Sequence, residues 1–170
     1  MEKRESWDEY FLRHVYLAAS RSKDPRTQIG AVVVRDNVII SEGYNGFPRG
    51  VIDNPEHYLD RQIKLAKTVH AEMNSVLNCA RIGVSSLNAI IYTNGTPCEN
   101  CAKSIIQAGI KEVIVHKEWE HLFLNNPNSH NWIKSVELSR TMFNEARVSV
   151  RFVSAVFDVK LRLDGKIIEI

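Results

Sequence analysis

The sequence has few cysteines, little net charge and no long apolar run. It has three cysteines, Cys79, Cys98 and Cys101, and a small, odd number of cysteines does not form a disulfide framework. A net charge of +2 does not by itself indicate a nucleic-acid or membrane partner. No apolar stretch approaches the roughly 20 residues of a membrane span, and the first ten residues, MEKRESWDEY, lack a signal-peptide pattern. We therefore expect no membrane partner and a cytoplasmic location, in the host cytoplasm if the chain is viral.

The composition is that of an ordinary globular protein, 44% hydrophobic and 25% charged over 170 residues. This length fits one domain with a substantial core. We expect a single domain over residues 1–170, in which a motif-bearing core covers about 5–153 and a hairpin extension about 154–170.

Helical and strand periodicities alternate along the chain, which predicts a layered α/β domain with helices on a mixed sheet. We expect no regular element over residues 117–131, which contain a polar loop. The expected helices lie at 7–20, around 58–67, and at 70–81, 97–108 and 131–146. The expected strands lie at 29–34, 38–41, 89–93, 113–116 and 148–153, followed by a terminal hairpin that turns at Asp164-Gly165.

Two short motifs, each at the start of an expected helix, carry the clearest chemical pattern. An H-x-E motif contains His70 and Glu72, and a P-C-x-x-C motif contains Cys98 and Cys101. Imidazole and thiolate are zinc ligands, and a catalytic zinc keeps three protein ligands. His70, Cys98 and Cys101 supply three, and a helix N-terminus favours the thiolate form of cysteine. Glu72 can lie beside such a metal without binding it, where it would transfer protons.

Simpler interpretations of these motifs exist. A redox-active C-x-x-C pair needs no H-x-E partner. A four-cysteine structural zinc site is excluded because only Cys79 remains, and we expect that residue to be a small buried side chain. His70 alone would more often be a core or surface histidine. The two motifs together match the signature of zinc deaminases.

Over most of residues 20–116 the chain resembles the cytidine deaminase superfamily, and within it the deoxycytidylate deaminase branch. The H-A-E and P-C-x-x-C motifs are typical of the superfamily. The stretches KDPRTQIGA, GYNGFPRG and CAKSIIQAGIKEV are closer to that branch. The resemblance implies a three-layer α/β/α fold with a mixed five-stranded central sheet and, at the end of the chain, a β-hairpin.

The resemblance also implies a hydrolase that converts dCMP to dUMP, which would supply thymidylate synthesis. One Zn²⁺ per chain would be held by His70, Cys98 and Cys101, with Glu72 as the catalytic residue. It further implies a homohexamer, activated by dCTP and inhibited by dTTP, with Mg²⁺ accompanying the effector.

Other expected site residues are less specific. Arg26 is a candidate phosphate partner because a guanidinium binds phosphate oxygens in pairs, although a single arginine is as often a surface residue. The resemblance places Asn45 on the sugar, whereas its spacing alone favours a simple turn. The expected substrate-binding residues are Asn45, Arg26, Ala71, Thr96 and Pro97, and the expected effector-binding residues are Tyr44 and Gly46.

Competing functions remain open at this point. The chain could be another deaminase of the superfamily, acting on a free base, a nucleoside or a tRNA adenosine, or a catalytically silent nucleotide-binding regulator. Basic residues near the C-terminus, such as Arg151 and Arg162, alternate with other types and lack the interleaved aromatics of single-strand binders. Nucleic-acid binding is therefore not the favoured interpretation.

Overall fold

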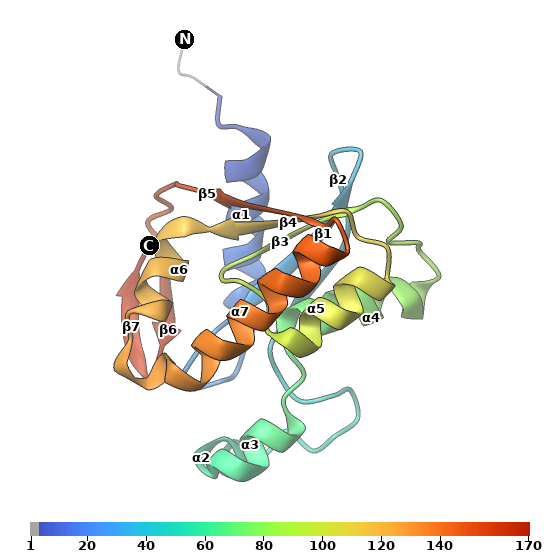
Figure 1. The fold of residues 1–170 in the computed structure, drawn as a ribbon. Coiled ribbons are helices and arrows are strands. Elements are labelled where there is room, and N and C mark those ends of the chain that lie inside the picture. The colour runs from blue at the N-terminus through green and yellow to red at the C-terminus, as the bar shows by residue number, and fades with distance from the viewer. Residues whose placement is uncertain (1–3) are drawn as a thin grey trace.

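A mixed five-stranded sheet forms the middle layer of the computed structural model, which describes residues 4–170 (Figure 1). The strand order is β2-β1-β3-β4-β5. Strand β1 pairs antiparallel with β2 and β3, whereas β3, β4 and β5 run parallel, so the expected mixed sheet is confirmed. The strands are β1 (Gly30–Arg35), β2 (Val38–Tyr44), β3 (Ile90–Thr93), β4 (Glu112–His116) and β5 (Ser149–Val153).

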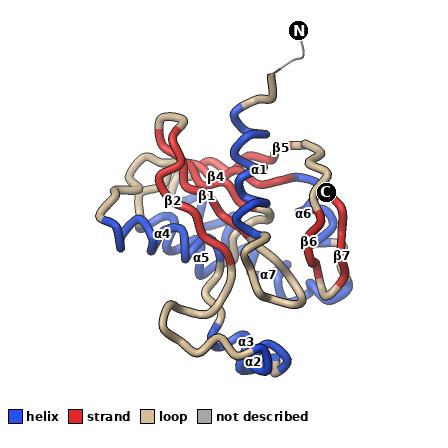
Figure 2. The backbone as a smooth tube through the Cα atoms, turned by 180° about the vertical axis from the view of Figure 1, so that it is seen from behind, coloured by secondary structure: helices blue, strands red, loops and turns tan. Residues whose placement is uncertain are grey.

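Helices cover both faces of this sheet, which confirms the expected three layers (Figures 1 and 2). Side chains of a strand alternate between its two faces. In β1, Ala31 and Val33 pack toward α4, α5 and α7, whereas Val32 and Val34 pack toward α1. The helices are α1 (Trp7–Ala19), α4 (Ala71–Ile82), α5 (Glu99–Gln107) and α7 (His130–Glu145).

The expected C-terminal hairpin is present and joins the layer that contains α1. It consists of β6 (Lys160–Leu163) and β7 (Lys166–Glu169), and Leu161 and Leu163 are buried in the same core cluster as α1. Its turn places Asp164 and Gly165 at φ of 49° and 78°. Two successive positive φ angles are typical of tight hairpin turns, in which Asp-Gly is a favoured pair.

Residues 117–131, for which we expected no regular element, contain helix α6 (Lys117–Leu124) and a 3₁₀ turn, η1 (Pro127–Ser129). That expectation was wrong. The N-cap residue of α6, His116, makes no side-chain capping bond, so the usual start signal is missing. The helix is held instead by tertiary packing, because Trp119 is almost completely buried.

Two short helices, α2 (Pro55–Leu59) and α3 (Arg61–Lys67), lie below the sheet in both views (Figures 1 and 2). We expected one helical segment here. The chain breaks at Asp60, whose carboxylate accepts hydrogen bonds from the backbone N–H groups of Gln62 at 2.8 Å and Ile63 at 3.0 Å. This capping starts a second helix in a new direction.

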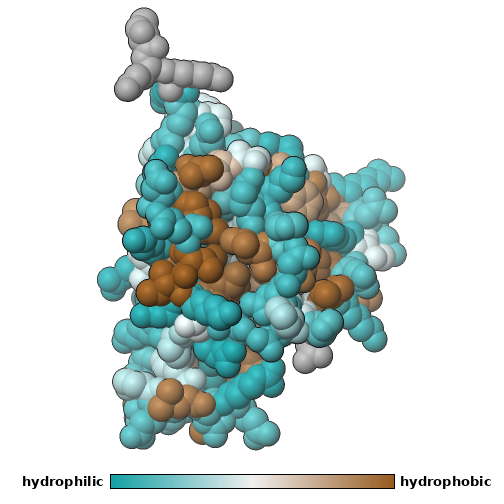
Figure 3. Space-filling view, turned by 90° about the vertical axis from the view of Figure 1, so that its left-hand side faces the viewer, coloured by the Kyte–Doolittle hydropathy of each residue, from teal (hydrophilic) through white to brown (hydrophobic). Residues whose placement is uncertain are grey.

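Hydrophilic side chains surround hydrophobic ones on the face shown in Figure 3, and a separate hydrophobic group lies at the lower end, over α2 and α3. Leu59 of α2 is 81% exposed and Leu65 of α3 is 51% exposed. Among the helices of residues 4–170, none combines the length and the apolar character needed to cross a membrane.

Candidate active site

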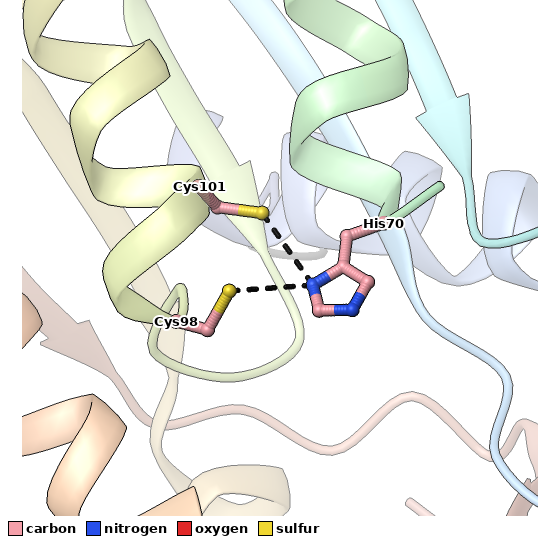
Figure 4. Close-up of side chains that lie close together, drawn as sticks. All are labelled: His70, Cys98 and Cys101. Atoms are coloured by element: carbon pink, nitrogen blue, oxygen red, sulfur yellow. Dashed lines mark hydrogen bonds between the residues drawn. The ribbon is translucent and has the colours of Figure 1, made fainter. Parts of the chain in front are cut away.

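The first turns of α4 and α5 bring the two motifs together. His70 is the N-cap residue of α4 and Cys98 that of α5, and neither side chain caps its own helix. The sulfur atoms of Cys98 and of Cys101, which lies one turn into α5, both point toward the ring of His70 (Figure 4). The Nδ1 atom of His70 lies 3.4 Å from Sγ of Cys98 and 3.5 Å from Sγ of Cys101.

These three side chains fit a zinc ion. Zn–S bonds of about 2.3 Å and Zn–N bonds of about 2.0 Å in a tetrahedron place neighbouring ligand atoms about 3.6 Å apart. The observed nitrogen–sulfur distances of 3.4 and 3.5 Å match this spacing, and all three ligand atoms lie within 4.8 Å of one another. The three ligands leave the fourth position of a tetrahedron for a non-protein group.

Electrostatics in this cluster also suit a cation. A hydrogen bond with Cys98 raises the pKa of His70 to about 9. The hydrogen bond from Cys101, together with that from His70, holds the pKa of the Cys98 thiol well below its usual range. The N-termini of α4 and α5 add partial positive charge that favours a thiolate. The site therefore presents an anionic sulfur.

Glu72 lies beside the ligands without being one of them. It is 5% exposed, and its Oε2 atom accepts a hydrogen bond from the Cys101 thiol at 3.6 Å. Burial raises the pKa of Glu72, because removal from water disfavours the charged carboxylate. A carboxyl group that holds its proton more firmly than usual, next to a metal site, is suited to both accepting and releasing a proton.

Gly43 allows α4 to approach the sheet closely enough to form this site. A Cβ atom at Gly43 would lie 2.4 Å from the carbonyl oxygen of Ala71 and 2.5 Å from the amide nitrogen of Ser75. Gly43 lies within β2, and only hydrogen at its Cα leaves room for the α4 backbone.

A cleft of about 550 Å³ opens beside the metal ligands. Its walls come from segments far apart in the sequence, namely the loop before β1, helix α3, the first turns of α4 and α5, and the segment from α6 to α7. His70, Ala71, Glu72 and Cys98 line it on one side.

Cations line another wall of the cleft, and most of them are paired. Lys64 forms an ion pair with Asp24 at 2.8 Å, in which the two side chains are only 12% and 4% exposed. Arg26 forms an ion pair with Asp164 in the turn of the C-terminal hairpin. The side chain of Arg61 has no hydrogen bond or ion pair with any other residue in the described part of the chain. Arg61 is therefore available to an anionic ligand without breaking an internal pair.

Asn45 lines the cleft and holds the loop before β1 in place. Its side-chain oxygen accepts from the Ile29 N–H at 2.8 Å, and its amide nitrogen donates to the Thr27 carbonyl at 2.8 Å. Asn45 is 6% exposed. The side chain therefore shapes the wall that contains Arg26.

Three aromatic residues that the sequence analysis did not predict as site residues form a further wall of the cleft. Trp119 and Phe123 stack with ring centroids 4.9 Å apart, and Trp132 lies 5.6 Å from the ring of His70. All three line the cleft. The spacing of four residues between Trp119 and Phe123 is a helical signal that could have revealed this face of α6.

The remaining expected residues divide into two groups. Thr96 lines the cleft, whereas Pro97 is buried nearby and is not among the lining residues. Tyr44, which is 40% exposed, and Gly46, which pairs with Val69, also lie outside the cleft lining. Both residues flank Asn45, which does line the cleft.

The family model described as "Cytidine and deoxycytidylate deaminase zinc-binding region" matches residues 5–117. The chain therefore belongs to this family, which confirms the resemblance seen in the sequence. It is 38% identical over 147 residues to a protein of Aliivibrio fischeri described as "Uncharacterized deaminase in luxG 3′ region", covering 86% of this chain and 93% of that one.

Two further relatives match a smaller share of their own length. The deoxycytidylate deaminase of Homo sapiens is 42% identical over 123 residues, which cover 68% of this chain and 67% of that enzyme. ComE operon protein 2 of Bacillus subtilis is 44% identical over 119 residues, which cover 69% of this chain and 63% of the relative. The chain thus spans about two thirds of these two relatives.

Among solved structures, the dCMP deaminase of cyanophage S-TIM5 in complex with dCMP and dUMP superposes with a TM-score of 0.65. It is 22% identical, and the match covers 89% of this chain and all of that one. This likeness confirms the cytidine-deaminase-like fold.

Proposed function

We propose that the protein is a zinc-dependent deaminase that hydrolyses dCMP to dUMP and ammonia. The observation that carries this proposal is the convergence of His70, Cys98, Cys101 and the buried Glu72 on one cleft. The cationic wall of that cleft suits a nucleotide phosphate. Relatives named as deoxycytidylate deaminases support the choice of substrate.

Zinc held by His70, Cys98 and Cys101 would act as a Lewis acid and make water in the cleft more acidic. Glu72 accepts a proton from the attacking water as its oxygen adds to C4 of the cytosine. Glu72 delivers this proton to N3, then takes the second proton of the water from the C4 hydroxyl and delivers it to the exocyclic amine. The C4–N bond breaks, ammonia leaves with the proton, and C4 keeps the oxygen as the carbonyl of uracil. Burial of Glu72 keeps this exchange away from bulk solvent.

Substrate orientation would come from the other walls. Arg26 and Arg61, with Lys64 beside them, are placed to attract the 5′-phosphate, and Asn45 lies on the wall where we place the sugar. Thr96, with Ala71 and Pro97 nearby, would border the base. The stacked rings of α6 offer an apolar surface for the pyrimidine.

Regulation forms a second part of the proposal. By family resemblance, dCTP with Mg²⁺ would activate the enzyme and dTTP would inhibit it, through a site that includes Tyr44 and Gly46. We also propose that the enzyme is a homohexamer in the cytoplasm and that it supplies dUMP for thymidylate synthesis. Tyr44 is 40% exposed, so its side chain is accessible to an effector.

The direct test is deamination of dCMP by the purified protein, with and without dCTP and Mg²⁺, followed by the absorbance change of cytosine and by release of ammonia. Deoxycytidine and cytidine monophosphate serve as parallel substrates, and Glu72→Gln protein serves as the background control. We expect turnover of dCMP with little turnover of deoxycytidine. A zinc-loaded protein that leaves dCMP unchanged under all these conditions would refute the substrate assignment and direct attention to other pyrimidines, free bases and tRNA.

A further inference from the structure

Glu120 is a buried carboxylate in α6 that belongs neither to the metal ligands nor to the cleft lining. It is 5% exposed. Its Oε2 atom accepts a hydrogen bond from the backbone N–H of Thr96 at 2.8 Å, and its Oε1 atom accepts one from the Thr96 hydroxyl at 2.6 Å. Arg140 of α7 donates to Oε1 at 2.9 Å. Both oxygens of one carboxylate are thus committed to a single residue, with a cation behind them.

The residue that Glu120 holds lies two positions before a metal ligand. Gly95 and Thr96 lie on the short connection between β3 and α5, which continues to Cys98, and all three line the cleft. This connection forms no strand or helix, so side-chain contacts must define its path.

A second contact from α6 holds the same connection. A Cβ atom at Gly95 would lie 2.4 Å from the Trp119 ring, so the backbone lies directly against that ring. Trp119 packs against Gly95 while Glu120 bonds Thr96. Two adjacent residues of α6 therefore act on two adjacent residues of the connection.

The bonding pattern is more specific than docking of α6 alone would require. An ion pair between Glu120 and Arg140 would be enough to join α6 to α7. The carboxylate instead satisfies a backbone N–H and a hydroxyl that are both buried, and bonds to an ionised acceptor are shorter and stronger than neutral ones. A buried N–H that loses its partner is strongly disfavoured, so loss of Glu120 would favour movement of this connection.

We propose that Glu120 is a positioning residue of the active site, acting through Thr96 on the location of Cys98 and of the adjoining cleft wall. Arg140 orients the carboxylate. The activity readout of this inference rests on the proposed function, whereas its metal readout does not.

The test compares Glu120→Ala with Glu120→Gln. Alanine removes both acceptors. Glutamine keeps one oxygen for the Thr96 N–H and places an amide beside the Thr96 hydroxyl, which can accept from it, but this amide offers no acceptor to Arg140. Arg151→Ala is the control, because it removes ion pairs, with Asp8 and Glu112, that lie away from the cleft. Each protein is purified with zinc, and its fold is checked by circular dichroism and thermal unfolding.

Three measurements are made on the folded, zinc-loaded proteins: kcat and KM for dCMP, and the rate at which zinc passes to a chromogenic chelator. Removal of a residue that orients a metal ligand typically costs roughly 10–100-fold in metal affinity or activity. We expect Glu120→Ala to lower kcat/KM and to speed zinc release, each by roughly 10–100-fold. Glu120→Gln should recover part of both losses, because it keeps the contacts to Thr96 but not the bond from Arg140, and Arg151→Ala should match the unmodified protein in both.

Thr96→Val gives an independent check, because it removes the hydroxyl and keeps the backbone N–H. Combined with Glu120→Ala, it should add no further loss in zinc retention, since both changes act on one contact. Unchanged kcat/KM and unchanged zinc release in folded Glu120→Ala protein would overturn the inference. Equal losses in Glu120→Ala and Arg151→Ala would also overturn it, because they would indicate general destabilisation. If no pyrimidine is deaminated, the zinc-release rates still decide this inference separately from the proposed function.

Discussion

The metal-ligand side and the cationic wall of the cleft are built in different ways. His70, Cys98 and Cys101 come from the first turns of two helices, and their ligand atoms meet within 4.8 Å. On the cationic wall, Arg26 and Lys64 are paired with carboxylates from distant parts of the chain, Asp164 and Asp24.

This difference separates groups that are assembled for chemistry from groups that also maintain the structure. The metal ligands cap no helix and are bonded mainly to one another. The paired cations join the loop before β1 to α3 and to the C-terminal hairpin. Changes on the metal side should therefore alter catalysis far more than folding, whereas changes on the cationic wall should affect both to a smaller extent.

The largest effect is expected from loss of a metal ligand. Cys98→Ala leaves two protein ligands for zinc, so the purified protein should contain little zinc and deaminate at background rate. Metal analysis and a dCMP assay check this outcome. Cys79→Ala is the matched control, because Cys79 is also buried but lies outside the ligand cluster. Zinc loss in both variants would contradict the assignment of ligands.

Glu72→Gln should separate metal binding from proton transfer. The amide keeps the size of the side chain but cannot carry the proton, so kcat should fall by roughly 10²–10⁴-fold. Zinc content should stay near that of the unmodified protein, because Glu72 is not a ligand. Glu99→Gln, in the first turn of α5, provides the comparison and should remain active. Full activity of zinc-loaded Glu72→Gln protein would remove Glu72 from the mechanism.

Arg61→Ala tests the unpaired cation of the other wall. We expect KM for dCMP to rise roughly tenfold, as for loss of a charge-assisted phosphate contact, while kcat/KM for deoxycytidine stays constant. Steady-state kinetics give kcat/KM for dCMP and for deoxycytidine, and the ratio of these two values shows whether the change acts on the phosphate. Arg81→Ala, an exposed arginine of α4 outside the cleft, controls for the change in net charge. An equal change for both substrates would argue against a phosphate contact.

Gly43→Ala should destabilise the protein by about 1–3 kcal/mol, because the added methyl group meets the α4 backbone rather than a movable side chain. Urea unfolding followed by circular dichroism measures this loss. The comparison is Gly46→Ala, whose Cβ would meet only the Tyr44 ring at 3.9 Å and should have little effect on stability. Similar stabilities of the two variants would show that α4 can shift away from β2.

The smallest effect is expected from the pair between Arg26 and Asp164. Hydrogen bonds from Arg26 and Asn128 lower the pKa of Asp164. A carboxylate with a lowered pKa contributes stability above its unfolded pKa of about 3.9, and this contribution disappears as pH falls through the lower folded value. Arg26 is 55% exposed, so Asp164→Asn should cost no more than about 1 kcal/mol at pH 7. The difference between the two proteins in urea unfolding should vanish at the acid end of a pH series.

The metal side of the cleft could be predicted from the sequence. Cys98 and Cys101 are three residues apart, which places them on one face of a helix, and the H-x-E motif of His70 and Glu72 completes the signature of a zinc deaminase. The order of strands and helices likewise predicted the layered sheet. The two-residue period of apolar side chains in strands and the 3.6-residue period in helices are visible in short stretches of sequence.

The other walls of the cleft depend on how distant segments pack together. Trp119 and Phe123 lie on a helix that lacks a capping signal, and Glu120 meets Thr96 across 24 positions of sequence. The need for glycine at position 43 follows from the close contact between β2 and α4. The pairs of Asp24 with Lys64 and of Arg26 with Asp164 depend on where the loop before β1, α3 and the hairpin come to lie. Contacts of this kind follow from the packing of distant segments, which no local pattern of residues specifies.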